Sequence, residues 1–324
     1  MKRYVRLARP FTLFPPLLGI ISGAVCAFGS AHNPDPSRRI TWAVVLTVAI
    51  GSLCASAMNA ASNIVNQIAD LEIDRHNKPE RPLVTGAISI RRAWRLAAVL
   101  YVLAIAPTWI VVPYPYQTLE ARIRAPLHLH AAFFIYCVGA FATFVYSFPA
   151  LGRTKRHWLA ANVTIAIPRG GLLKVAGWAF VASVAVWEAW AIGGIFALFL
   201  LGATSTKDFS DMEGDREHGC VTLPVRFGVR RAARIIAPFF VLPWLAIPLL
   251  ARLPDPQSSA PLLTGNRALL TILGFGLAAW GAYAAYLLLK DPEDLARTEN
   301  HPAWTHMYLL LMAAQAGFAL AYVF

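Results

Sequence analysis

Long apolar runs separated by short polar connections dominate this chain. Of its 324 residues, 57% are hydrophobic, and the mean hydropathy of +0.53 is typical of integral membrane proteins. A run of about 20 apolar residues can cross a bilayer as a helix. Nine runs approach this length, near residues 11–29, 41–62, 93–113, 131–149, 158–177, 182–203, 234–251, 267–289 and 306–323. The sequence therefore predicts an all-α integral membrane protein with nine transmembrane helices.

The fifth run differs from the others because Pro168, Arg169, Gly170 and Gly171 interrupt it. A broken helix at membrane depth is tolerated only where it faces protein or a water-filled cavity. We therefore expect a single domain, residues 1–324, in which the nine helices are bundled around a central cavity. The connections that carry polar motifs would form helix-loop caps on the cytoplasmic side.

The charge distribution predicts the orientation of the chain in the membrane. The formal net charge is +12, but the basic residues alternate between connections and form no continuous stripe, so we expect no nucleic-acid partner. The N-terminal arm and every second connection hold 21 of the 29 Lys and Arg, and the opposite side holds six. By the positive-inside rule, the N-terminus is cytoplasmic and the C-terminus lies outside, in a prokaryotic-type inner or plasma membrane.

Two copies of the motif Asp-x-Glu-x-Asp-Arg stand out from this apolar background. The first contains Asp70 and Asp74, and the second contains Asp211 and Asp215. In each copy the two Asp are four residues apart, so a helix places them on one face, one turn apart. Carboxylate pairs of this kind repel each other unless a cation lies between them. Carboxylate oxygens with a few waters are the ligands that Mg²⁺ accepts, usually together with substrate phosphates.

The simplest interpretation of one such motif is a solvated helix end with surface salt bridges. Repetition of the motif, with basic residues following each copy, favours a binding site instead. Two acidic turns rimmed by Arg and Lys could neutralise a diphosphate through metal ions and charge-assisted hydrogen bonds. The rim of an apolar bundle suits a lipid diphosphate, because a prenyl tail gains about 0.8 kcal/mol for each buried carbon.

At these motifs the chain resembles the UbiA superfamily of intramembrane prenyltransferases. The family motif NxxxDxxxD matches Asn66, Asp70 and Asp74, and its second motif, DxxxD, matches Asp211 and Asp215. An Asp-Arg-x-Asn-Lys-Pro run after the first motif and a Thr-Leu-Pro-Val run after the second also resemble the family. So do Arg9-Pro-Phe-Thr12 and Tyr146-Ser-x-Pro. The resemblance covers the whole chain and implies a fold of nine helices with the N-terminus inside.

The resemblance implies Mg²⁺-dependent ionisation of an allylic prenyl diphosphate, followed by capture of the carbocation by an acceptor. Tyr146 would stabilise the cation or the leaving oxygen, and Arg169 would face the acceptor, because an Arg facing lipid is costly. The implied metal ligands are Asp70, Asp74, Asp208, Asp211 and Asp215, and the other implied substrate contacts are Asn66, Arg75, Lys78, Arg81, Lys155, Lys207 and Arg226.

The motifs leave the acceptor open between aromatic and lipid molecules: a homogentisate or quinone head group, geranylgeranylglyceryl phosphate, or a chlorin. Prenyl chain length and oligomeric state are also open. A transporter of a divalent cation or a phosphate ester could use the same acidic rim, although transporters more often place ionisable residues at mid-membrane. A CDP-alcohol phosphotransferase would need a DG-x-x-A-R run, which we do not find before the acidic pairs.

Overall fold

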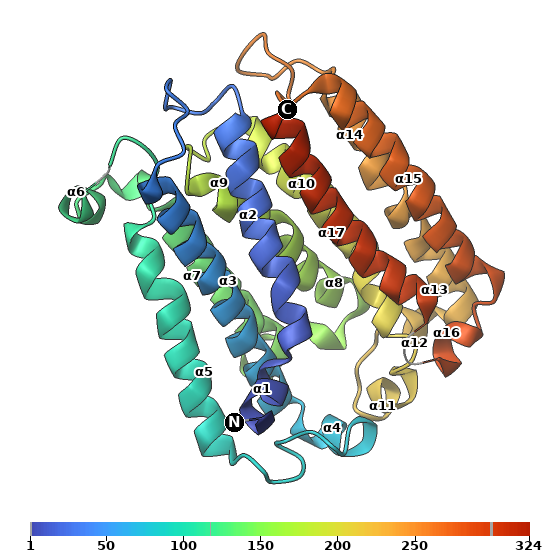
Figure 1. The fold of residues 1–324 in the computed structure, drawn as a ribbon. Helices are drawn as coiled ribbons and strands as arrows, with labels where there is room; N and C mark the ends of the chain where they lie inside the picture. The colour runs from blue at the N-terminus through green and yellow to red at the C-terminus, as the bar shows by residue number, and fades with distance from the viewer. Residues whose placement is uncertain (1, 117, 299–300) are drawn as a thin grey trace.

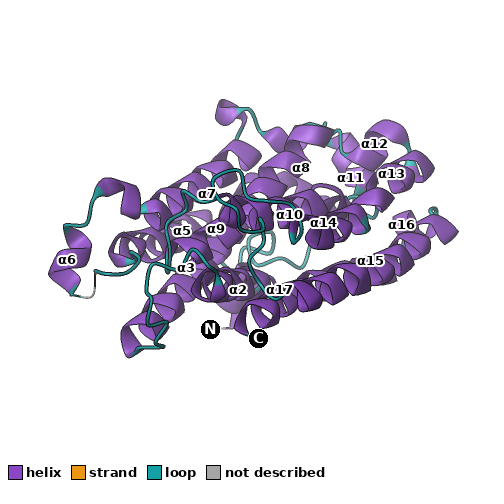
Figure 2. Cartoon of the chain, turned by 90° about the horizontal axis from the view of Figure 1, so that it is seen from above, coloured by secondary structure: helices purple, strands orange, loops and turns teal. Residues whose placement is uncertain are grey.

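The computed structural model describes residues 2–116, 118–298 and 301–324. Across these ranges the chain folds as a bundle of helices (Figures 1 and 2). Seven helical segments are long and apolar enough to cross a membrane: Pro10–Gly29, Trp42–Ala69, Ile90–Ile110, Trp187–Lys207, Val229–Leu250, Arg267–Lys290 and Pro302–Val323. An all-α membrane fold is therefore confirmed.

Two of the nine expected spans have a different form. The fourth is α7 (Ala131–Ser147), an apolar helix of 17 residues, which is shorter than a usual span. The fifth is divided into α8 (Trp158–Ala166), a π-helical turn η6 (Ile167–Leu172) and α9 (Leu173–Ala179). The break falls at the Pro-Arg-Gly-Gly sequence that interrupts the apolar run.

The other bundle helices and their short extensions follow the apolar runs. These helices are α2 (Phe14–Gly29), α3 (Trp42–Ala69), α5 (Ile90–Ile105), α10 (Trp187–Ala203), α13 (Val229–Ile236), α14 (Leu242–Leu250), α15 (Arg267–Lys290) and α17 (Pro302–Val323). The 3₁₀ turns next to them are η1 (Pro10–Leu13), η2 (Ala106–Ile110), η7 (Thr204–Lys207) and η8 (Ala237–Phe240).

Short helices lie at the two ends of the bundle (Figure 1). With the N-terminus at one end, here called the motif end, are α1 (Lys2–Ala8), α4 (Leu71–Asn77), α11 (Met212–Glu217), α12 (Leu223–Phe227) and α16 (Asp294–Arg297). The C-terminus and α6 (Leu119–Ile123) lie at the opposite end, here called the far end. The remaining 3₁₀ turns are η3 (Leu127–Leu129), η4 (Pro149–Leu151) and η5 (Thr154–Arg156).

Three amides on one face of α3 hold the N-terminal segment against the bundle. Asn59 Nδ2 donates to the Thr12 carbonyl at 2.8 Å, and Asn63 Nδ2 donates to Thr12 Oγ1 at 2.8 Å. One turn further along, Gln67 Nε2 donates to the Leu7 carbonyl at 2.8 Å. The four-residue spacing puts the amides on one side of the helix. They fix the chain on either side of Arg9.

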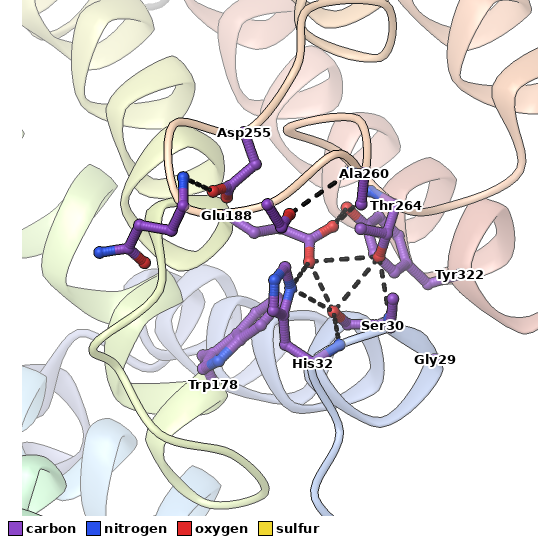
Figure 3. Close-up of polar contacts among 12 residues, drawn as sticks. Gly29, Ser30, His32, Trp178, Glu188, Asp255, Ala260, Thr264 and Tyr322 are labelled. Carbon is purple, nitrogen blue, oxygen red and sulfur yellow. Dashed lines mark hydrogen bonds and ion pairs between the residues drawn. The ribbon is translucent and has the colours of Figure 1, made fainter.

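At the far end, a buried carboxylate joins segments that are distant in sequence (Figure 3). Glu188, in the first turn of α10, is fully buried. It accepts hydrogen bonds from Ser30 Oγ and from Tyr322 OH, each at 2.5 Å. The Thr264 backbone N–H donates to it at 2.5 Å, and His32 Nδ1 lies 3.0 Å away. This group of five residues, the Glu188 cluster, ties α10 to the ends of α2 and α17.

Candidate functional site

A cavity of about 390 Å³ extends from the two acidic motifs into the bundle. Two helices contribute one face each, with the spacing of three and four residues that a helical face requires. From α3 the cavity is lined by Ala55, Met58, Asn59, Ser62, Asn63 and Asn66, and from α7 by Ile135, Tyr136, Gly139, Ala142, Thr143, Tyr146 and Ser147. The cavity therefore runs along the membrane helices and has both polar and apolar walls.

Both acidic motifs form the helical turns expected from their spacing. Asp70 ends α3 and precedes α4, and the Asp74 backbone N–H donates to the Asp70 carbonyl at 2.8 Å. Asp211 precedes α11 in the same way, and the Asp215 N–H donates to the Asp211 carbonyl at 3.0 Å. All four of these Asp side chains line the cavity. The two motifs, far apart in sequence, face one space.

The middle glutamate of each motif behaves differently from the aspartates. Glu72 is exposed and pairs with Arg75 at 2.7 Å, outside the cavity lining. Glu213 is also exposed and outside the lining. On a helix, a residue two positions away from another points to a different side, so each glutamate points away from the two aspartates of its motif. Each motif thus presents two carboxylates inward and one outward.

Basic side chains compensate the charges of the first pair. Lys155 Nζ and Arg81 Nη1 donate hydrogen bonds to the carboxylates of Asp70 and Asp74, respectively. Arg153 Nη2 also lies 3.4 Å from Asp70. Burial raises the pKa of Asp74, while the hydrogen bond from Arg81 opposes this rise. Both carboxylates of this pair are buried and paired.

The second pair lies in a more acidic environment, together with Asp208. Burial, and then the charges of Asp215 and Asp211, raise the pKa of Asp208 to about 8. Burial, and then the charge of Asp211, raise the pKa of Asp215 to about 6. A cation beside these carboxylates would favour their charged forms. The electrostatics of the second motif therefore suit a bound cation.

A metal ion would need ligands in addition to these side chains. Within the described residues, no group of three or more His, Cys, Asp or Glu side chains converges on one position that could hold an ion. Mg²⁺ usually keeps several waters and binds through one or two carboxylates plus substrate phosphates. Two separate Asp pairs of hard oxygen ligands fit that pattern.

Further basic residues line the same cavity. Lys78 and Lys207 are both part of its lining. Arg9 also lines it, with a left-handed backbone at φ 54°. Burial, and then the charge of Arg81, lower the pKa of Arg9 to about 10, so the side chain keeps its positive charge at neutral pH. These residues give the motif end of the cavity cationic groups beside its carboxylates.

Two residues expected from the sequence to contact substrate lie outside the cavity lining. Arg75 pairs with Glu72 on the exposed side of α4. The Arg226 guanidinium lies over the rings of Trp158 and Phe227, 5.5 and 5.4 Å from their centroids. The expected residues that do line the cavity are Asn66, Asp70, Asp74, Lys78, Arg81, Tyr146, Lys155, Arg169, Lys207, Asp208, Asp211 and Asp215.

The broken fifth span contributes Arg169 to the cavity wall. On one side of η6, Gly170 packs against α10, where an added Cβ would lie 2.7 Å from the backbone of Ala197. Pro168 and Arg169 line the cavity. π turns are rare and often occur at functional sites. The close approach to α10 explains why position 170 is glycine.

Several residues of the cavity were not among the expected contacts. Arg9 and Thr12 line it and belong to a run that resembles the family, but no role was predicted for them. Arg153 lies outside the cavity lining but contacts the same carboxylate as Lys155, that of Asp70. Gln315 lines a small adjoining cavity, and the signal that could have revealed it was an amide within an apolar run.

Comparison with known proteins identifies the fold and the family. A model of the UbiA prenyltransferase family matches residues 16–310. The chain belongs to this family.

Individual relatives differ in their acceptors. Over 236 residues the chain is 34% identical to a probable homogentisate phytyltransferase 2 of Oryza sativa subsp. japonica, covering 70% of this chain and 56% of that protein. It is 30% identical over 252 residues to a digeranylgeranylglyceryl phosphate synthase of Pyrococcus abyssi, covering 75% of each. A UbiA homolog from Archaeoglobus fulgidus, bound to GPP and Mg²⁺, has the same fold, with a TM-score of 0.66 and 21% identity over 99% of both chains.

Proposed function

We propose that this chain transfers a prenyl group from an allylic prenyl diphosphate to an acceptor held in the same membrane cavity. The observation that carries the proposal is a single cavity lined by two Asp pairs, by Lys155, Lys207 and Arg81, and by apolar helix faces. The acidic and basic groups suit a metal diphosphate, and the apolar walls suit its hydrocarbon tail. The solved UbiA homolog bound to GPP and Mg²⁺ supports this proposal.

Mg²⁺ is the proposed cofactor, with candidate ligands Asp70 and Asp74 on one side of the cavity and Asp208, Asp211 and Asp215 on the other. No three carboxylates of the described residues converge on one point, so phosphate and water oxygens would complete the coordination. Asn66, one turn before Asp70, would support the first pair. Bound there, the ion would neutralise the charge that develops on the diphosphate as it leaves.

The chain's own basic side chains would complete the diphosphate site. Lys155 and Arg81 already lie against Asp70 and Asp74, so they are positioned to donate charge-assisted hydrogen bonds to phosphate oxygens beside those carboxylates. Lys78 and Lys207 would add positive charge. When the carbon–oxygen bond breaks, its electron pair leaves with the diphosphate, and donors aimed at those oxygens stabilise the charge.

The prenyl tail would extend between α3 and α7. From Asp70 to Ala55 the lining covers 15 residues of α3, or about 22 Å at 1.5 Å per residue. Tyr146, on the facing side of α7, lies near the diphosphate end, where its ring could stabilise the carbocation. The acceptor would attack the first carbon of the tail and lose a proton as the new bond forms.

We also propose that the chain crosses the membrane nine times, with the motif end in the cytoplasm. The termini lie at opposite ends of the bundle (Figure 1), which requires an odd number of crossings, and the basic residues concentrate on the N-terminal side. In that orientation α4 and α11 form the cytoplasmic caps. The test is a C-terminal fusion to a reporter that works only in the cytoplasm. Reporter activity in that fusion would contradict this orientation.

The transporter alternative has less support. The relatives described above are named as a transferase and a synthase, and the charged residues of the acidic motifs lie at one end of the bundle (Figure 1). The acceptor classes remain those of the family: an aromatic head group, a chlorin or a lipid phosphate.

The experiment uses purified protein in lipid nanodiscs with Mg²⁺ and geranylgeranyl diphosphate, and measures diphosphate release and prenylated product over a panel of acceptors. We expect both to require Mg²⁺ and an acceptor, and we expect Asp211→Asn to reduce both at least 100-fold. The matched control is Glu213→Gln, which removes a carboxylate from the same motif but on its outward side. If no prenyl donor of any length is consumed with any acceptor, the proposal is wrong.

A further inference from the structure

Arg169 is a cation without a protein counter-ion inside the membrane bundle. Eleven residues separate it from Trp158 at the start of α8, so it lies about 16 Å along the helix from that point. That distance is about half the thickness of a 30 Å hydrocarbon core, so if the proposed fifth span begins at Trp158, Arg169 lies near its middle. Within the described part of the chain, its guanidinium makes no hydrogen bond or ion pair. Ionisable groups at such depth usually face an interior partner.

The nearby charges do not supply that partner. Arg9, a second cation, lies close enough for Arg169 to lower its pKa further. The carboxylates of the first motif are already paired with Lys155 and Arg81. The Arg169 side chain is exposed where it lines the cavity. An anionic ligand there would be stabilised by both guanidinium groups, whereas a neutral ligand would give Arg169 no ionic partner.

A second, independent observation comes from the small cavity of about 80 Å³ next to Arg169. Arg169 lines both this cavity and the main one. Gln315 of α17 lines the small cavity as well, and only 4% of this residue is exposed. Its Nε2 donates to the Pro15 carbonyl at 3.4 Å, but its Oε1 is buried without a hydrogen-bond partner in the structure. A buried acceptor atom of this kind is costly unless a ligand donates to it.

We propose that Arg169 and Gln315 bind the acceptor, and that the acceptor carries an oxyanion, either a carboxylate or a phosphate, together with a hydroxyl group. The oxyanion accepts hydrogen bonds from Arg169, and the hydroxyl donates to Gln315 Oε1. This inference rests on the proposed prenyl transfer and specifies which acceptors it uses. It excludes acceptors without an anionic group.

The depth of Arg169 distinguishes this role from that of the diphosphate site. Lys155, which contacts Asp70, precedes Arg169 by 14 residues along the broken span. The donor's phosphates therefore have cationic partners at the motif end. The oxyanion at Arg169 belongs to the second substrate.

The test compares charged and uncharged forms of two acceptors in nanodiscs: homogentisate against its methyl ester, and geranylgeranylglyceryl phosphate against geranylgeranylglycerol. We expect the wild type to prefer the charged form in at least one pair. Arg169→Gln should raise the KM for that form about 10- to 100-fold, the range for losing a hydrogen bond to a charged group. The KM for the prenyl donor and the rates with the uncharged forms should not change.

If Arg169→Gln loses the preference for homogentisate over its methyl ester, the oxyanion is a carboxylate. If it loses the preference for geranylgeranylglyceryl phosphate over geranylgeranylglycerol, the oxyanion is a phosphate. Gln315→Leu should raise the KM of the same acceptor without removing the preference for charge. The control is Lys174→Met, which removes a buried amine from the same broken span at a position outside both cavity linings. Thermal unfolding of each variant checks that it folds.

Two results would overturn the inference while leaving prenyl transfer intact. One is an equal effect of Arg169→Gln on charged and uncharged acceptors, and the other is a raised KM for the donor. Acceptor binding to donor-free protein, measured by calorimetry, separates the two proposals: charge-dependent binding lost in Arg169→Gln supports the acceptor site even if no prenyl donor is consumed. Binding that does not depend on acceptor charge contradicts it.

Discussion

The Lys155 ammonium donates a hydrogen bond to the Asp70 carboxylate, and so joins the loop after α7 to the first acidic motif. Both side chains are buried. Removing one partner of a buried ion pair leaves the other charge uncompensated. This contact therefore bears on both the folding of the motif end and the binding of an anionic substrate there.

We expect Lys155→Met to lower kcat/KM for the prenyl donor by about 10- to 100-fold, because a charged hydrogen bond to the diphosphate is lost. Steady-state kinetics with varied donor concentration would measure this. Arg75→Gln is the matched control, because Arg75 follows the same motif but points outward and pairs with Glu72. Equal losses in the two variants would contradict the arrangement of the site.

Metal removal should abolish turnover. We expect EDTA to stop diphosphate release and added Mg²⁺ to restore it, since the cavity carboxylates need a cation to share with the phosphates. Asp215→Asn should shift the Mg²⁺ concentration for half-maximal rate at least 10-fold upward. Activity that persists in a metal-free, chelated preparation would rule out this role for Mg²⁺.

Gly139 should determine which donors fit. It lies on the cavity face of α7, and a Cβ built there meets no atom within 4 Å. A side chain added at this position would therefore begin in free space at the cavity wall. We expect Gly139→Leu to lower kcat/KM for the longest accepted donor more than 10-fold. The kcat/KM for geranyl diphosphate should not change.

The control for that substitution is Gly276→Leu. Gly276 of α15 is exposed, is equally free of neighbours, and lies outside the cavity. Competition between donors of different length in one reaction would measure the preference. An unchanged preference in Gly139→Leu would show that the tail does not pass this residue.

The Glu188 cluster should contribute to the stability of the folded protein but not to substrate binding. Glu188→Ala removes the acceptor for hydrogen bonds from Ser30, Thr264 and Tyr322, and leaving buried donors unpaired costs about 1–3 kcal/mol each. We expect a clear fall in the thermal unfolding temperature, with a smaller fall in Glu188→Gln. KM values at low temperature should match the wild type, and a changed donor KM would point to a role in the site instead.

The positions of the helices and of the acidic turns could be predicted from local pattern alone. An apolar run of about 20 residues and two Asp four apart each have few structural solutions. The direction of a long basic side chain does not follow from sequence in the same way. Arg75 and Arg226 follow the two motifs just as Lys78 follows the first, although Arg226 is further along the chain. A surface glutamate and a pair of aromatic rings hold these two arginines outside the cavity.

Contacts between distant segments could not be predicted from the sequence, for a different reason. Glu188 looks like an ordinary first-turn residue of α10, and only the folded chain brings Ser30 and Tyr322 to it. Gln315 could have been noticed as an amide in an apolar helix, but its unpaired oxygen is visible only once α17 is packed. The roles assigned to the Asp residues, Tyr146 and Arg169 remain predictions.

The π-helical turn determines which residues of the broken fifth span face the cavity. Thr164, Pro168, Leu172 and Ala176 all line the cavity at intervals of four residues. In a regular α-helix each such step advances about 40° around the axis, so the last residue would have turned about 120° away from the first. The wider turn at Ile167–Leu172 removes much of that drift. Local underwinding thus lets one helical segment present a straight wall to the substrates over three successive turns.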